Sequence, residues 1–104
     1  IGMKIRIDKL ILFCYYNLMH SLTNTVLEKL KAQDVDVVSV ELSEKLALED
    51  DIINLSKGFY LTINPSEGYL MFWRENQDSH EEICELSPEA NFAKVIQLKI
   101  EEAK

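Results

Sequence analysis

The stretch GFYLTINPSEGYLMFWREN, residues 58–76, holds two apolar runs on either side of Asn64-Pro-Ser-Glu-Gly68. These five residues favour turns, so the pattern predicts a β-hairpin. Strict alternation would divide its side chains between two faces. We expect one face to carry Phe59, Leu61, Ile63, Tyr69, Met71 and Trp73, and the other to carry Tyr60, Thr62, Leu70 and Phe72. Because residues 69–73 are apolar on both faces, we expect their strand to be central or covered.

The chain after the hairpin predicts a further strand and a helix. HEEICELS (80–87) alternates as a strand near a sheet edge does, with Glu81, Ile83 and Glu85 on one face and His80, Glu82, Cys84 and Leu86 on the other. Ser87-Pro88-Glu89 is a typical helix start, which favours a helix that includes 92–101. IQLKIE (96–101) also alternates, so a strand stays open as the alternative.

The chain before the hairpin predicts strand, helix, strand, helix. Leu10–Tyr16 is a continuous apolar run typical of a buried strand, and Leu22, Val26 and Leu30 form the apolar line of a helix over 19–33. The segment DVDVVSVELS (34–43) favours a strand. Ser43 is expected to cap a second helix whose apolar line is Leu48, Ile52 and Leu55.

The predicted fold class is therefore α/β, with α+β as an alternative. The expected order is β-α-β-α-β-β-β-α in one domain over 1–104. Strand-helix-strand units normally form parallel pairs, so we expect a mixed sheet with a parallel N-terminal βαβ unit and an antiparallel C-terminal meander.

Composition indicates a soluble, cytoplasmic protein. The chain has 104 residues, of which 47% are hydrophobic, and no apolar run approaches the roughly 18 residues of a membrane span. Cys14 and Cys84 both lie in apolar stretches and are expected to be buried free thiols, although a disulfide between them stays open.

The net charge of −7 is unevenly distributed. Residues 34–51 hold seven acidic residues, including Glu41, against Lys45 alone. Phosphates would be repelled by such a surface, so nucleic acid is not an expected partner, whereas a basic protein surface is. Solvation alone also explains acidic loops. The tentative partner-binding residues are Asp34, Asp36, Glu44, Glu49, Asp50, Asp51, Tyr69 and Trp73.

The sequence offers little for catalysis, and we expect no metal and no cofactor. His80 and Cys84 would be about 13 Å apart on a strand, which is too far for one zinc ion. Neither a glycine-rich phosphate loop nor a G-x-S-x-G turn is present.

LILFCYYNLMHS (10–21) and VLEKLKAQDVDVVSVELS (26–43) resemble the first strand, active-site turn, helix and second strand of the thioredoxin and glutaredoxin family. The resemblance implies a site at the helix start, where Leu18 and Ser21 stand in place of the family's two cysteines. Thiol–disulfide exchange is therefore not implied. The corresponding degenerate site would comprise Cys14, Leu18, His20 and Ser21, and Pro65 would occupy the family's proline position.

Three hypotheses follow. The first is a small, acidic, non-catalytic protein-binding module, such as an inhibitor or a toxin-neutralising immunity protein that docks on a basic partner. The second is a thioredoxin-like oxidoreductase or another small enzyme that uses Cys14 or His20. The third is a homodimer that forms through an edge strand or through Tyr69 and Trp73. None of the three requires a membrane.

Overall fold

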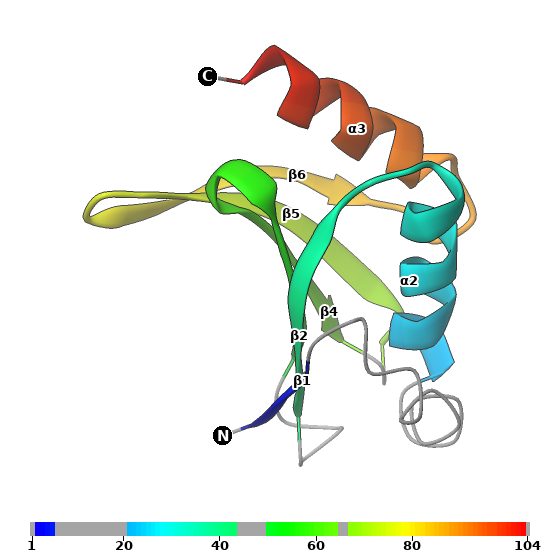
Figure 1. Cartoon of the computed structure of the whole chain (residues 1–104). Helices are drawn as coiled ribbons and strands as arrows, with labels where there is room; N and C mark the ends of the chain where they lie inside the picture. The colour runs from blue at the N-terminus through cyan, green and yellow to red at the C-terminus, as the bar shows by residue number, and fades with distance from the viewer. Residues whose placement is uncertain (1, 6–20, 44–49, 65–66, 104) are drawn as a thin grey trace.

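The computed structural model describes residues 2–5, 21–43, 50–64 and 67–103, and the first of these ranges only by its backbone. In these ranges the elements are β1 (Gly2–Ile5), α2 (Ser21–Ala32), β2 (Val37–Ser43), β3 (Asp51–Leu55), the 3-10 turn η2 (Ser56–Gly58), β4 (Phe59–Asn64), β5 (Tyr69–Asn76), β6 (Ser79–Leu86) and α3 (Phe92–Glu102). The six strands form one sheet in chain order, and every neighbouring pair is antiparallel. Both helices lie on the same face of the curved sheet (Figure 1).

The predicted mixed sheet with a parallel N-terminal βαβ unit is wrong. β2 follows α2 as expected, but it pairs antiparallel with β1 on one side and with β3 on the other. A strand-helix-strand segment gives a parallel pair only when its connection crosses over the sheet, whereas here β2 runs back beside β1 although α2 lies between them in the chain. The strand predicted at 10–16 lies outside the described residues.

The second predicted helix is also wrong, because residues 51–55 form β3. Its burial alternates, with Asp51, Ile53 and Leu55 buried and the two residues between them half-buried. The helix prediction placed Ile52 and Leu55 on one apolar line, but in a strand they face opposite sides of the sheet. Leu48 lies outside the described residues.

Four predicted elements are confirmed. The helix α2 lies within the predicted range 19–33. The predicted hairpin is formed by β4 and β5, and residues 80–86 of the predicted further strand belong to β6. The C-terminal segment is a helix rather than a strand, since Phe92, Ala93 and Ile96 are buried at helical spacing. The predicted start at Ser87-Pro88-Glu89 is wrong, because these residues lie in a turn and the helix begins at Phe92.

The hairpin's two faces differ from the sequence prediction. The register pairs Asn64 with Tyr69 and therefore Leu61 with Phe72. Residues directly opposite one another share a face. The first face consequently carries Phe59, Leu61, Ile63, Leu70 and Phe72, and the second face carries Tyr60, Thr62, Tyr69, Met71 and Trp73. The predicted alternation within each strand is confirmed, but the predicted pairing between the two strands is wrong by one residue.

The core lies between the first face of the sheet and the two helices. The strands contribute Val40, Leu42, Ile53, Leu55, Phe59, Leu61, Ile63, Leu70, Phe72 and Leu86, and the helices contribute Val26, Leu27, Leu30, Phe92, Ala93 and Ile96. All of them are less than a tenth exposed. Burial of each large side chain stabilises the fold by about 1.5–3 kcal/mol. None of the helices among the described residues is long and apolar enough to cross a membrane.

The turn η2 holds α3 against the sheet. The Lys57 ammonium donates hydrogen bonds to the carbonyl oxygens of Ile100 and Ala103, at 2.9 Å each. A cation at these carbonyls also complements the negative end of the helix dipole. Arg74 holds the turn from the other side: its Nε donates to the Lys57 carbonyl at 3.3 Å and its guanidinium lies 4.8 Å from the Phe59 ring.

Gly58 and Gly68 both adopt left-handed backbone conformations, with φ of 81° and 69°. Their surroundings differ. A Cβ at Gly58 would lie 2.9 Å from the Glu75 carbonyl oxygen, whereas one at Gly68 would meet nothing within 4 Å. Gly58 therefore permits both the turn and the close approach of β5, and Gly68 only the turn.

We expect Gly68→Ala to lower the free energy of unfolding by about 1 kcal/mol, the ordinary cost of a left-handed alanine. Gly58→Ala adds a backbone clash and should cost about 2–4 kcal/mol in total. Urea denaturation of both variants measures the difference. Equal losses would show that the contact with Glu75 does not constrain the turn.

Candidate binding face

The second face of the sheet, opposite α2 and α3, has an aromatic and polar surface. Registers from β2 to β6 place the following residues on it: Ser39, Glu41, Ile52, Asn54, Tyr60, Thr62, Tyr69, Met71, Trp73, Glu75, His80, Glu82 and Glu85. Its three aromatic side chains are half-buried, and the acidic residues of β6 are exposed. This face therefore keeps large rings within reach of a partner.

Tyr60 and Trp73 form a rigid pair at the centre of this face. They lie directly opposite each other on β4 and β5, with ring centroids 6.0 Å apart and planes within 2° of parallel. The indole Nε1 donates to Thr62 Oγ1 at 2.9 Å, which fixes the orientation of the Trp73 ring. The Tyr60 hydroxyl is 2.8 Å from His80 Nδ1 on β6. The pair is thus held in place before any ligand binds.

A β-bulge in β6 brings two glutamates to the same face. Phe72 pairs with Cys84 but Trp73 pairs with Glu82, so Ile83 is the extra residue. Before the bulge in the chain, His80 and Glu82 lie on the second face, and after it Glu85 lies there opposite Met71. The sequence prediction grouped His80 and Glu82 with Cys84 and Leu86, and Glu85 with Glu81. That grouping is wrong because a bulge shifts the alternation by one residue.

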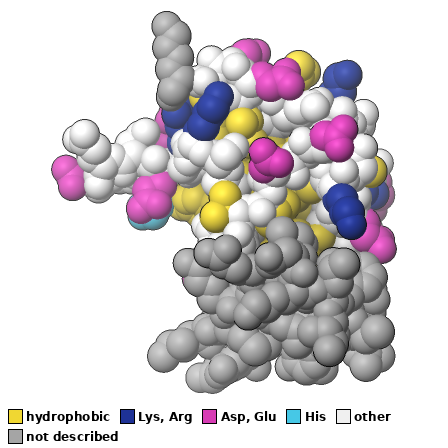
Figure 2. Space-filling model, viewed as in Figure 1, with side chains coloured by type: hydrophobic (Ala, Val, Ile, Leu, Met, Phe, Trp, Pro, Cys, Tyr) yellow, Lys and Arg dark blue, Asp and Glu magenta, His cyan; other side chains and the backbone are white. Residues whose placement is uncertain are grey.

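The hairpin of β5 and β6 is strongly acidic. Residues 69–86 contain five acidic residues against Arg74, a net charge of −4. Figure 2 shows acidic side chains on the part of the molecule that projects sideways, where Figure 1 places the turn between β5 and β6. The β6 side of the second face is therefore a region of negative potential.

The negative potential contributes to raised pKa values of two tyrosines on the second face. Desolvation raises the pKa of Tyr69, and the negative charges of Glu85, Glu82, Asp50 and Glu67 raise it further. Desolvation and then Glu75 likewise raise the pKa of Tyr60. A neighbouring carboxylate disfavours the phenolate because like charges repel.

The acidic block predicted at 34–51 does not form one surface. Asp34 and Asp36 are exposed before β2, and Asp50 is exposed beyond its other end, about 20 Å away along the strand. Glu44 and Glu49 lie outside the described residues. Tyr69 and Trp73 do share one face, as their pairing with β4 requires. Sequence reasoning missed Tyr60, Glu82 and Glu85, whose common location depends on the register and the bulge.

Asp34 has a backbone role at the end of α2. It adopts φ of 59°, and its N–H donates to the Lys31 carbonyl at 3.0 Å. The N–H of Val35 donates to the Leu30 carbonyl at 3.0 Å. These two bonds form a Schellman motif, in which the left-handed position is usually glycine.

Asp51 was expected on the surface, but it is fully buried on the first face. Its Oδ2 accepts a 2.6 Å hydrogen bond from the Thr23 hydroxyl, and its Oδ1 accepts one of 2.7 Å from the Ser43 N–H. The carboxylate thereby connects α2 to β2 and β3. Its role is structural.

The degenerate redox site falls mostly outside the described residues, which exclude Cys14, Leu18 and His20. Ser21 is the first residue of α2, and its carbonyl accepts a 3.0 Å hydrogen bond from the Thr25 hydroxyl. Cys84 is a half-buried free thiol packed against the core. No group of three potential metal ligands occurs within the described part of the chain.

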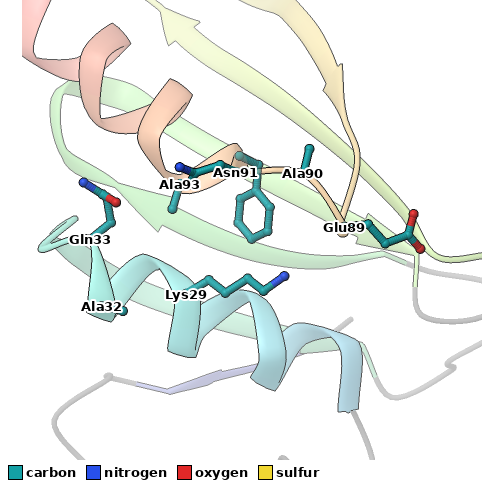
Figure 3. Close-up of a pocket in the computed structure, with 8 residues that line it drawn as sticks. Lys29, Ala32, Gln33, Glu89, Ala90, Asn91 and Ala93 are labelled. Atoms are coloured by element: carbon teal, nitrogen blue, oxygen red, sulfur yellow. The ribbon is translucent and has the colours of Figure 1, made fainter.

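A shallow groove of about 360 Å³ lies between α2 and the segment that precedes α3. Figure 3 shows Lys29 and Gln33 on its α2 side and Glu89, Ala90 and Asn91 on the other. Lys29 Nζ donates to the Pro88 carbonyl at 2.7 Å and lies 5.6 Å from the Phe92 ring centroid. Gln33 and Gln97 also bond across the helices at 2.9 Å. Lys29 and Gln33 therefore already have partners across this groove.

Comparison with known protein families, curated proteins and solved structures finds no match for this chain.

Removal of the buried carboxylate is expected to destabilise the fold. Asp51→Ala leaves the Thr23 hydroxyl and the Ser43 N–H without this acceptor, and should lower the free energy of unfolding by about 2–4 kcal/mol. The exposed neighbour provides the control, since Asp50→Ala should change it by less than about 0.5 kcal/mol. Chemical denaturation measures both, and a loss as small as the control's would contradict the structural role of Asp51.

The charge of Glu85 is expected to contribute to the raised pKa of Tyr69. Glu85→Gln should lower this pKa, yet leave it above the ordinary 10.0 because desolvation remains. NMR titration of the tyrosine ring carbons measures the change, with the exposed Glu89→Gln as control.

Since the folded state keeps the phenolic proton of Tyr69 to higher pH than the unfolded state, this tyrosine makes the free energy of unfolding fall as pH rises above about 10. An unchanged pKa of Tyr69 in the Glu85→Gln variant would contradict the electrostatic effect of Glu85 on this tyrosine.

Proposed function

We propose that this protein is a small non-catalytic binding module that docks on a basic surface of a protein partner through the second face of its sheet. The observation that carries the proposal is the fixed Tyr60–Trp73 pair beside the carboxylates of Glu82 and Glu85. An inhibitor or a toxin-neutralising immunity protein would have this kind of activity.

The aromatic centre supports a role in protein binding. Tyrosine and tryptophan are enriched where partners bury their strongest contacts, because each offers a large area at a small cost in side-chain entropy. The indole's hydrogen bond to Thr62 and its stacking on Tyr60 reduce that cost further, because the ring is already ordered in the free protein.

The charge distribution supports a basic partner. The chain carries −7 overall, and −4 of this lies on residues 69–86. Complementary potentials accelerate encounter and select against acidic partners, including nucleic acids. We include a cytoplasmic location in the proposal, since a free thiol such as that of Cys84 is typical of reducing compartments.

Charge reversal tests the proposal. The probe is a synthetic peptide in which lysine and arginine alternate with serine, and the only tryptophan of the chain, Trp73, supplies a fluorescence signal on the proposed face. We expect Glu82→Lys/Glu85→Lys to weaken binding at least tenfold or so, by replacing attraction with repulsion. Added salt should weaken binding of the unmodified protein.

The matched control is Glu101→Lys/Glu102→Lys at the end of α3, which changes the net charge equally on exposed residues of another element. This variant should keep most of the affinity. If both double variants bind equally weakly, attraction to net charge explains the binding and the second face is not the docking surface. Absence of binding to the basic peptide, or equal binding of a glutamate–serine peptide, would also refute the proposal.

A further inference from the structure

The outer edge of β6 is accessible to a further strand. Within the described ranges β6 is the last strand of the sheet and pairs with β5 alone. An edge strand presents a row of N–H and C=O groups that have no partner in the sheet. The side chains from Ser79 to Glu82 are exposed on both faces of the sheet. Figure 1 places this part of β6 in the hairpin that projects beyond the helices.

The charge of β6 selects against a second copy of this chain as the occupant of the edge. Charged side chains commonly protect edge strands from pairing with identical strands. β6 carries Glu81, Glu82 and Glu85 and has neither lysine nor arginine. Two copies side by side would bring these glutamates together, and like charges on neighbouring strands are destabilising. The same charges attract a strand that carries lysine or arginine.

The two faces of this edge differ in the cations already present on β5. Glu81 lies on the first face, where its direct neighbour on β5 is Arg74. Glu82 and Glu85 lie on the second face, where their direct neighbours on β5 are uncharged. A basic residue of a partner is therefore expected on the second face rather than the first.

The bulge determines the spacing at which a partner strand would meet these charges. Glu82 and Glu85 are three positions apart in the chain, but the extra residue Ile83 lies between them. Their neighbours on β5, Trp73 and Met71, are only two positions apart. A regular strand thus meets both glutamates with residues i and i+2, which share one face of that strand. We expect the same spacing on the outer side of β6.

We propose that the outer edge of β6 pairs with a β-strand of the partner in which lysine or arginine occupies every second position. Main-chain hydrogen bonds extend the sheet by one strand, and the basic side chains lie on the second face beside Glu82 and Glu85. In such pairing the main chain supplies affinity and the alternate side chains supply specificity. This proposal rests on the proposed function above, because it specifies how the basic partner docks.

Amide hydrogen exchange measured by NMR tests the backbone pairing. The probe is a peptide in which lysine and arginine alternate with threonine, a residue that favours strands. In the free protein we expect alternate amides of β6 to exchange rapidly, because β5 can bond only the others. A saturating amount of the peptide should slow these amides at least about tenfold. The amides of α3 serve as the control and should not change.

A second peptide tests the spacing of the charges. It has the same composition, but its basic residues stand in pairs separated by two threonines, so it never has cations at both i and i+2. We expect it to bind about fivefold more weakly in calorimetry. Glu82→Gln should weaken binding of the alternating peptide about threefold. The matched control is Glu81→Gln, which should weaken it less because Glu81 lies on the other face beside Arg74.

Other results separate this inference from the proposed function. Binding that is lost in Glu82→Lys/Glu85→Lys, but that leaves the β6 amides exchanging as in the free protein, would overturn the edge pairing and leave the docking face intact. Equal affinity for the two peptides, or equal losses in Glu81→Gln and Glu82→Gln, would likewise overturn the edge pairing.

Slow exchange of every β6 amide without peptide would overturn it as well, since a second copy or another part of this chain would then occupy the edge. Failure of both peptides to bind would overturn both proposals.

Discussion

The pairing register of β4 with β5 is the constraint on which the rest of the structure depends. Because side chains alternate along a strand, a shift of one residue in the pairing would bring the wrong sides of these two strands together. The observed register places Leu61 and Phe72 under the helices, and Tyr60 with Trp73 on the opposite face. The turn fixes this register: the Asn64 side chain accepts from the Glu67 N–H at 3.0 Å, and the Asn64 carbonyl accepts from the Gly68 N–H at 2.9 Å.

Two irregularities adapt the sheet around this central pair. In β2, Val37 pairs with Leu55 and Ser39 with Asn54, which leaves Val38 as an extra residue that is 59% exposed. In β6, Ile83 plays the same part. A bulge allows a strand to keep apolar residues on the core side while turning the remainder outward. The β6 bulge thereby gives the core Cys84 and Leu86, and gives the second face Glu82.

Local signals in the sequence were sufficient for part of the fold. The apolar line of α2 and the turn residues at 64–68 each act over a few residues, and the elements that they predict are present. The signal at 87–89 predicts the helix α3 but places its start too early, since α3 begins at Phe92. Local signals could not predict that residues 51–55 form a strand. The spacing of Ile52 and Leu55 is compatible with one face of a helix, and it is equally compatible with opposite faces of a strand. Only pairing with β2 and β4 distinguishes the two.

The candidate site was harder to predict for the same reason. Tyr69 and Trp73 attracted attention by residue type alone, whereas the contribution of Tyr60 and Glu82 depends on which residues pair across three strands. Asp51 shows the opposite error, since its position beside Glu49 and Asp50 suggested a surface charge. Asp51 is buried because the alternation along β3 places its side chain on the first face, where it accepts a hydrogen bond from Thr23.

The bonds from Lys57 to the end of α3 also have a consequence for the order in which the chain folds. They join residues that are 43 and 46 positions apart in the sequence. An unordered loop of this length costs entropy to close, so we expect these groups to meet after the intervening hairpin has formed. Lys57 of the turn η2 thus donates to one carbonyl in the last turn of α3, that of Ile100, and to one directly after the helix, that of Ala103. We expect this end of the helix to be completed late in folding and to fray first when β4 and β5 separate.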